Sequence, residues 1–176
     1  MRKRADAGRI ESFLHAFGAG APIEATVHLT GGATAVLIGW RASTIDIDIR
    51  IEPDDDRLLR SLPELKEELQ VNVELASPAD FIPTVPGWRE RSLFVARHGH
   101  VSYYHYDFYA QALSKVERGH EQDTRDVSEM LRRGLIERRR AIELYEQIEP
   151  ALYRYPAIDP PSFRAKVRAA FDSSEE

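Results

Sequence analysis

The sequence predicts an α/β fold of the α+β type, in which strands and helices alternate up to residue 106 and only helices follow. Residues 44–51 carry isoleucine at every second position, which is the period of a strand packed on one face. Residues 5–19 instead place large apolar side chains at the spacing of an amphipathic helix. We therefore expect a core, residues 1–106, a helical part, residues 107–150, packed on it, and a Pro-rich, then polar tail, residues 151–176, with a mobile end.

The remaining elements are predicted by periodicity and by capping residues. Further strands are expected at 25–29, 71–75, 93–96 and 101–106, the last two as a hairpin. Further helices are expected at 33–38, from about 54 to 69 with an interruption at Pro63, and at 107–118, 123–133 and 137–148. Residues 77–90, which are rich in proline, are expected to form a structured loop.

Composition excludes several classes of site. The chain has no cysteine, so disulfides, zinc–thiolate sites and thiol nucleophiles are excluded, which is compatible with a cytoplasmic protein. No apolar run is long enough to span a membrane. The net charge of -5 argues against a nucleic-acid binder held by bulk charge alone. Acidic residues prevail over 51–80 and basic residues over 111–140; these are either solvated helix faces or an acidic metal site and a basic phosphate-binding part.

The most informative pair is Asp46 and Asp48, two residues apart in the predicted strand 44–51. Alternate residues of a strand point to the same side, so the two carboxylates are expected a few ångströms apart. Such a pair repels unless a cation or a proton lies between the groups, and hard oxygen ligands suit Mg²⁺. The alternative is the polar edge of an amphipathic strand.

A glycine pair, Gly31 and Gly32, follows the strand at 25–29 and precedes a short helix. Glycines let backbone amides approach a phosphate without interference from a Cβ, although a tight turn explains them equally well. The order of strand, glycine pair, helix and carboxylate strand predicts that the turn lies beside the aspartates. Arg41, Ser43 and Thr44 directly precede the carboxylates and are candidates to bind a triphosphate; Arg41 has the alternative of an ion pair with Asp46 or Asp48.

These motifs resemble the nucleotidyltransferase superfamily related to DNA polymerase beta. Within it, Gly31-Gly32-Ala33, Arg41, Thr44 and Asp46-Ile47-Asp48 resemble small bacterial proteins grouped with abortive-infection nucleotidyltransferase toxins, and residues 76–83 resemble one branch of that group. The resemblance covers roughly residues 25–135. It implies a mixed sheet with flanking helices and a C-terminal helical part.

The same resemblance implies an activity. It implies magnesium-dependent transfer of a nucleoside monophosphate from a nucleoside triphosphate (NTP) to a hydroxyl of RNA, protein or a small molecule, with two Mg²⁺ ions. A toxin of a toxin–antitoxin pair, with an antitoxin protein as partner, is implied by analogy.

The family also implies a third carboxylate from a later strand. Glu74, in the predicted strand 71–75, shares a face with Asn72 and is the better match; Asp80 is the alternative, and neither residue binding metal is the third possibility. Toxin-like members carry a lysine and a downstream aspartate on the helical part, which Lys115 and Asp126 match. We expect Lys115 to face the carboxylates and to bind phosphate, Asp126 to hold Lys115 or to help deprotonate the acceptor, and Asp123 to be a helix N-cap.

Other interpretations are weaker. A non-catalytic nucleotide- or partner-binding module on the same fold remains the main alternative to an enzyme. A metal nuclease is disfavoured because Arg50 and Ala76, not lysine, stand two residues after Asp48 and Glu74. The third glycine of a dinucleotide-binding loop is missing after Gly32. His98, His100 and His105 are expected to be strand and hairpin residues. The aromatic residues of 103–109 are expected in the core, with a base-stacking platform as the alternative, and Arg138–Arg140 as a solvated helix start, with contact to an acidic partner or RNA as the alternative.

Overall fold

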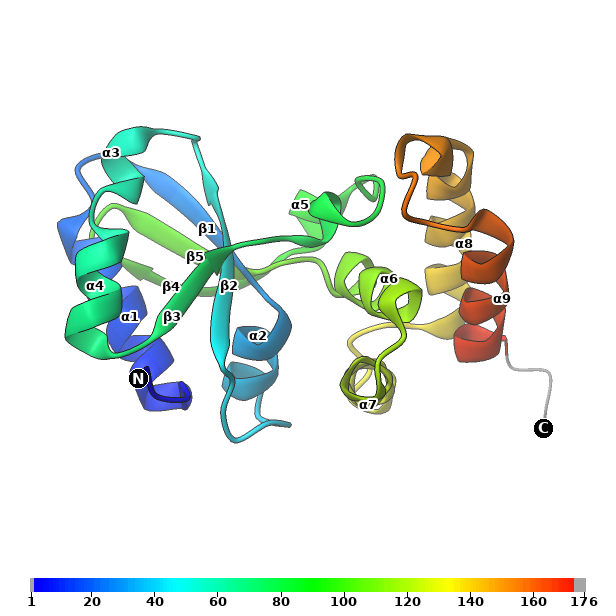
Figure 1. Ribbon diagram of the computed structural model, residues 1–176, viewed down its shortest axis with the longest axis horizontal. Helices are drawn as coiled ribbons and strands as arrows, with labels where there is room; N and C mark the ends of the chain where they lie inside the picture. The colour runs from blue at the N-terminus through cyan, green and yellow to red at the C-terminus, as the bar shows by residue number, and fades with distance from the viewer. Residues whose placement is uncertain (1, 173–176) are drawn as a thin grey trace. The chain divides into compact units, whose positions relative to one another are not determined.

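The computed structural model describes residues 2–172 and divides into two compact units (Figure 1). The first unit holds the described residues up to Ser77 together with Ser92–Tyr106. The second unit holds Pro78–Arg91 and the described residues from Asp107 onward. The segment 78–91 therefore leaves the first unit, joins the second, and returns to complete the sheet.

A five-stranded mixed sheet forms the centre of the first unit. Its strands are β1 (Ala25–Thr30), β2 (Asp46–Glu52), β3 (Asn72–Leu75), β4 (Leu93–His98) and β5 (Val101–His105), in the spatial order β3-β2-β1-β5-β4. β1 pairs antiparallel with β2 and parallel with β5, β2 pairs parallel with β3, and β4 and β5 form an antiparallel hairpin. The mixed sheet with flanking helices that the family resemblance implies is therefore confirmed.

One face of this sheet is the hydrophobic core. The isoleucines of the alternating strand, Ile47 and Ile49, are fully buried there. Helices α1 (Ala7–Gly20) and α4 (Leu62–Leu69) lie on this face, and Phe13 and Leu65 belong to the same cluster (Figure 1). Because strand residues alternate, Asp46 and Asp48 must point to the opposite face.

Capping residues set the helix boundaries of this unit. Asp6 precedes α1, and its side chain accepts a hydrogen bond from the backbone N–H of Arg9. Pro63 separates α3 (Asp56–Leu59) from α4 by starting the second helix, as predicted. α2 (Gly31–Ile38) begins two residues before the predicted start and ends at Gly39, which has a φ of 117°.

The second unit is helical in the part of the chain that the structure describes. Its helices are α5 (Trp88–Arg91), α6 (Phe108–Arg118), α7 (Glu121–Arg132), α8 (Arg138–Ile148) and α9 (Pro160–Phe171), with 3-10 turns η1 (Pro78–Asp80) and η2 (Glu149–Arg154). α6 begins after Asp107, whose side chain accepts from two backbone N–H groups, and ends at Gly119 in the left-handed region, as predicted.

Two segments differ from expectation. The expected loop 77–90 contains η1 and the start of α5, because Trp88 is buried and anchors a helical turn. The expected tail contains α9, in which prolines occupy the first helical positions, and Phe163, Val167 and Phe171 form a buried stripe. The mobile end that we expected lies at 173–176, outside the described residues. Among the helices described, none is both long and apolar enough to cross a membrane.

Candidate active site

The register of the sheet collects polar side chains on the face opposite the core. Asp48 pairs with Thr30 of β1 on one side and with Glu74 of β3 on the other. Asp46 pairs with Asn72. Directly paired residues of neighbouring strands share a face, so these five side chains form one polar patch. Three of them are the carboxylates Asp46, Asp48 and Glu74, predicted from the sequence.

The glycine turn lies against this patch. Gly31 has a φ of 61°, a conformation that residues with a side chain rarely adopt. A Cβ at Gly31 would lie 3.0 Å from Oδ2 of Asp48. The prediction that the glycine turn lies beside the carboxylate pair is therefore confirmed, and the first turn of α2 faces Asp48 without an intervening side chain.

The second glycine has a different local role. A Cβ at Gly32 would lie 2.0 Å from Oγ1 of Thr44, so no side chain fits there. The Thr44 hydroxyl is buried and donates to the backbone carbonyl of Asp46 at 3.1 Å. Thr44 thus connects the start of α2 to the start of β2. The Arg41 guanidinium lies at the same turn, since its Nη1 is 3.1 Å from the Cβ position of Gly32.

Ser43, the remaining candidate of this segment, contacts the N-terminal part of the chain. Its hydroxyl accepts a hydrogen bond from Nε of Arg4 at 2.8 Å, and its backbone carbonyl accepts from the same guanidinium. An arginine that donates to a hydroxyl leaves that hydroxyl's own proton available to an acceptor such as a phosphate oxygen.

Asn72 is a site residue whose role the sequence did not reveal. Its Nδ2 donates to Oδ1 of Asp46 at 2.6 Å and to Oε1 of Glu74 at 3.2 Å. Its Oδ1 in turn accepts from Arg2 at 2.8 Å. The amide therefore joins two of the carboxylates and fixes their orientation. The available signal was the position of Asn72 two residues before Glu74 in one strand.

The donor set fits Mg²⁺ only together with a substrate. Within residues 2–172, no three His, Cys, Asp or Glu side chains are grouped closely enough to hold a metal ion by themselves. Mg²⁺ is usually held by one or two carboxylates, with waters and substrate phosphates completing the octahedron. Asp46 and Asp48 supply that chemistry, while the Asn72 amide N–H lies between Asp46 and Glu74.

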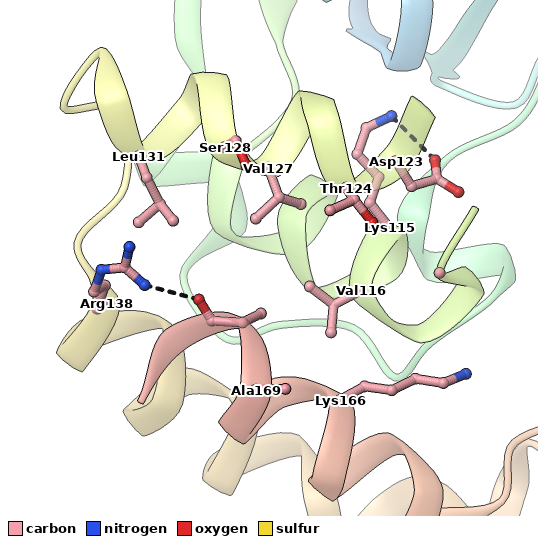
Figure 2. Close-up of a pocket in the computed structure, with 12 residues that line it drawn as sticks. Lys115, Val116, Asp123, Thr124, Val127, Ser128, Leu131, Arg138, Lys166 and Ala169 are labelled. Carbon is pink, nitrogen blue, oxygen red and sulfur yellow. Dashed lines mark hydrogen bonds and ion pairs between the residues drawn. The ribbon is translucent and has the colours of Figure 1, made fainter. Parts of the chain in front are cut away.

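The other predicted residues lie in the second unit. Asp80 ends η1 and is exposed. Lys115 is buried in α6, and its Nζ donates to Oδ2 of Asp126 at 2.7 Å and lies 3.6 Å from Oδ1 of Asp123. Figure 2 shows Lys115 beside Asp123 at one side of a cavity of about 500 Å³ between α6, α7 and α9. Asp126 thus holds Lys115, one of its two predicted roles.

A family model described as nucleotidyltransferase of unknown function (DUF6036) matches residues 21–154. The chain belongs to this family. The match includes the glycine turn, both aspartates of β2 and the Lys115–Asp126 pair, and it confirms the resemblance to nucleotidyltransferases. Comparison with curated proteins and with solved structures gives no match.

One predicted helix cap was wrong. Asp123 is not the N-cap of α7; His120 is, and Asp123 stands three residues later. From there the Asp123 carboxylate accepts from the backbone N–H of His120 and from the Arg118 guanidinium, at 3.2 and 2.7 Å. Burial raises the pKa of Asp123, but its bond with Arg118 and the charge of Lys115 outweigh burial and hold that pKa below the usual value.

The histidines and aromatics largely follow the prediction. Tyr103, Tyr106 and Phe108 are core residues. His105 of β5 is buried and lies 3.0 Å from the hydroxyl of Thr34 in α2; burial lowers its pKa to about 4. Tyr104 and Tyr109 are the exceptions, since both are only partly buried; Tyr104 pairs with His28 and points away from the core of the first unit.

Proposed function

We propose that the chain is a magnesium-dependent nucleotidyltransferase that binds an NTP at the first turn of α2 and transfers its nucleoside monophosphate to a hydroxyl group. The observation that carries the proposal is the contact of Gly31 with Asp48. A helix N-terminus attracts phosphate through its backbone N–H groups and its dipole, and α2 starts within reach of two carboxylates suited to Mg²⁺.

In this proposal the residues have distinct roles. Asp46 and Asp48, with Glu74 as third carboxylate and Asp80 as its alternative, would hold one or two Mg²⁺ ions, which would stabilise the negative charge on the transferred phosphate and on the leaving pyrophosphate. Gly31 and Gly32 give the phosphates access to the backbone of α2. Arg41 and the hydroxyls of Ser43 and Thr44 would contact the triphosphate.

The reaction joins the acceptor oxygen to the α-phosphorus and breaks the bond from that phosphorus to the bridging oxygen of the β-phosphate. Pyrophosphate leaves, and the hydroxyl proton passes to a carboxylate of the site or to water. The roles that the resemblance implies for Lys115 and Asp126 stay predictions. To bind phosphate, the Nζ of Lys115 would have to leave Asp126 and donate to a phosphate oxygen instead.

The acceptor class is part of the proposal. RNA, protein and a small molecule all offer a hydroxyl. The resemblance to abortive-infection toxins favours RNA or protein, and by the same analogy an antitoxin protein would inhibit the transfer.

The decisive experiment measures which phosphate of a labelled NTP is transferred to the acceptor. The protein is incubated with each NTP labelled in the α-phosphate, with Mg²⁺ or with a chelator, and with cell RNA or lysate. We expect Mg²⁺-dependent transfer of α-label, no transfer of γ-label, and no transfer by Asp48→Asn. Transfer of γ-label instead would indicate a kinase and overturn the proposal. Absence of both transfer and Mg²⁺–NTP binding would overturn it as well.

One observation favours a second candidate, a nucleotide-binding module without catalysis. The Asn72 amide bridges Asp46 and Glu74 where a full three-carboxylate site needs both groups for metal. A binding module would retain Mg²⁺–NTP affinity in a calorimetric titration but would transfer no label to any acceptor. In that case Asn72→Ala, which removes the bridge and frees Asp46 and Glu74, is the variant to test for gain of turnover.

A further inference from the structure

A row of side chains crosses the sheet beside the carboxylate patch. Arg50 follows Asp48 by two residues in β2 and shares its face. Arg50 pairs with His28 of β1, His28 pairs with Tyr104 of β5, and Tyr104 pairs with Phe94 of β4. Each pair shares a face, so all four point to the side of Asp46 and Asp48. We call these four residues the aromatic row.

Ring contacts confirm the row. The rings of His28 and Tyr104 are stacked with centroids 5.6 Å apart, and those of Tyr104 and Phe94 meet edge to face, also at 5.6 Å. Exposure rises along the row: His28 is buried, Tyr104 is partly exposed, and Phe94 is 56% exposed. Phe94 is no more exposed than several other apolar side chains of the chain, but its ring adjoins that of Tyr104, so the two form a contiguous aromatic surface on the face of the carboxylates.

The chemistry of the row fits nucleobases. Successive bases of a single strand stack on aromatic side chains of sheets, typically two or three bases per sheet. An arginine at the end of such a row can bind a backbone phosphate or stack on a base. The net charge of -5 requires that such binding rest on stacking more than on bulk charge.

The spacing also fits an acceptor. Tyr104 lies two strands from Asp48, about 10 Å across the sheet, and one pair of residues along it, about 7 Å. A base on Tyr104 would thus be close to a terminal hydroxyl at the carboxylates, and a base on Phe94 would lie one strand further away.

We propose that the acceptor is a single-stranded nucleic acid whose bases stack on Tyr104 and Phe94 while Arg50 binds its backbone. This proposal rests on the proposed transferase function and names the acceptor class of the same site. The shared chemistry is that of a base and a phosphate, so RNA and DNA oligonucleotides form separate arms of the test.

The test measures binding of fluorescent ten-nucleotide RNA and DNA by anisotropy, in chelator and without NTP. We expect the wild-type chain to bind single strands in at least one arm. Tyr104→Leu and Phe94→Leu should each weaken binding about tenfold. The matched control is Phe81→Leu: Phe81 is 54% exposed but lies in the second unit.

Charge is tested in the same assay. Arg50→Gln should weaken binding, whereas Arg57→Gln should not. Each arginine pairs with one carboxylate, Arg50 with Glu52 and Arg57 with Asp55, but Arg57 lies in α3, outside the row. One or two phosphate contacts predict a shallow salt dependence, with log K falling by about 0.7 per contact for each decade of salt. A steep salt dependence, which indicates many phosphate contacts, would show that the strand binds elsewhere and would overturn the proposal.

Other outcomes also overturn it. The first is that the wild-type chain binds no single strand, and the second is that Phe81→Leu weakens oligonucleotide binding as much as the row variants do. The third is that the row variants lose affinity for NTP but not for oligonucleotides, which would make the row a site for the base of the NTP. Calorimetric titration of Mg²⁺–NTP into the same variants separates this failure from failure of the transferase proposal, since Asp48→Asn tests the latter alone.

Discussion

At the scale of single residues, the glycine turn shows how sequence constrains the site. Position 31 requires glycine because of its backbone conformation, since Gly31 has a φ of 61°. Position 32 requires glycine because Thr44 occupies the space that a Cβ of Gly32 would need. The two adjacent glycines therefore have different roles. The first leaves the backbone accessible to Asp48, and the second allows the start of α2 to pack closely against the start of β2.

Gly32→Ala is expected to lower the free energy of unfolding by about 1–3 kcal/mol, because the new methyl group must displace buried Thr44. Gly20→Ala is the matched control, since a Cβ there meets nothing within 4 Å. Urea unfolding measures both. Equal stability of the two variants would contradict the seating role of Gly32.

Asp48→Asn is expected to weaken Mg²⁺–NTP binding more than about tenfold without destabilising the apo protein, because Asp48 lies opposite Glu74 and near Asp46 in a cluster of like charges. Calorimetric titration and thermal unfolding provide the two readouts. Unchanged affinity would remove Asp48 as a ligand, and a large loss of stability would show that it is structural.

The sequence predicted those features that depend on the periodicity of a single strand. The strict alternation of β2 predicted which face holds Asp46 and Asp48, and the chain order predicted that Gly31 lies beside them. It could not find the Asn72 bridge or the aromatic row, because both depend on the register between strands distant in the chain. Register is a property of pairing, which one strand's pattern does not contain.

At the scale of elements, buried polar contacts hold helices in place. The α6–α7 pair is joined by Lys115, Asp126, Asp123 and Arg118, three of which are buried or nearly so. Gln122 adds a hydrogen bond to the second oxygen of Asp126 at 3.1 Å. A lysine that only binds phosphate could be replaced by alanine with little change in the thermal midpoint, whereas the buried ion pair of Lys115 with Asp126 predicts a loss of stability.

Lys115→Ala is expected to cost about 3–5 kcal/mol of stability, because it leaves Asp126 charged and buried without its ammonium partner. Arg125→Ala removes an exposed ion pair with Glu121 within α7 and should lower the free energy of unfolding by less than about 1 kcal/mol. Denaturant unfolding of both variants checks the difference. A Lys115→Ala variant of normal stability but lower NTP affinity would instead favour the phosphate-binding role.

Burial of His105, the last residue of β5, predicts a pH dependence. His105 has a folded pKa of about 4 against 6.5 for an unperturbed histidine, so the unfolded state binds more protons between these values. Its stabilising contribution is therefore complete above pH 6.5 and is lost as pH falls toward 4. Between pH 7 and 5 the loss is about 2 kcal/mol. His105→Gln should flatten this part of the profile, as measured by urea unfolding at pH 7 and pH 5.

Element boundaries were predictable wherever a cap is encoded locally, as at Asp107 and Gly119 of α6. They failed where tertiary burial decides. α9 starts with prolines and has polar neighbours, so its helical stripe was hidden in a Pro-rich tail. Asp123 lies at the third helical position of α7, where an acidic residue accepts from the cap backbone, and sequence alone does not separate that position from the cap.

At the scale of the whole molecule, the division into two units predicts where a substrate acts. The glycine turn, the carboxylates and the aromatic row all belong to the first unit, whereas the Lys115–Asp126 pair belongs to the second. A ligand that binds only the native state stabilises by about 2.7 kcal/mol at a hundred times its dissociation constant. That stabilisation should appear first in the elements that the ligand contacts.

Hydrogen–deuterium exchange with and without Mg²⁺–NTP tests this directly. We expect slower exchange at the start of α2 and along β2 and β3, because these segments hold the proposed phosphate and metal ligands, and unchanged exchange in α8 and α9 of the second unit. Asp48→Asn should abolish the protection at every segment. Protection that extends to α6 would support phosphate binding by Lys115, since that helix has no other predicted ligand. Protection confined to the second unit would contradict the assignment of the nucleotide site to β2 and α2.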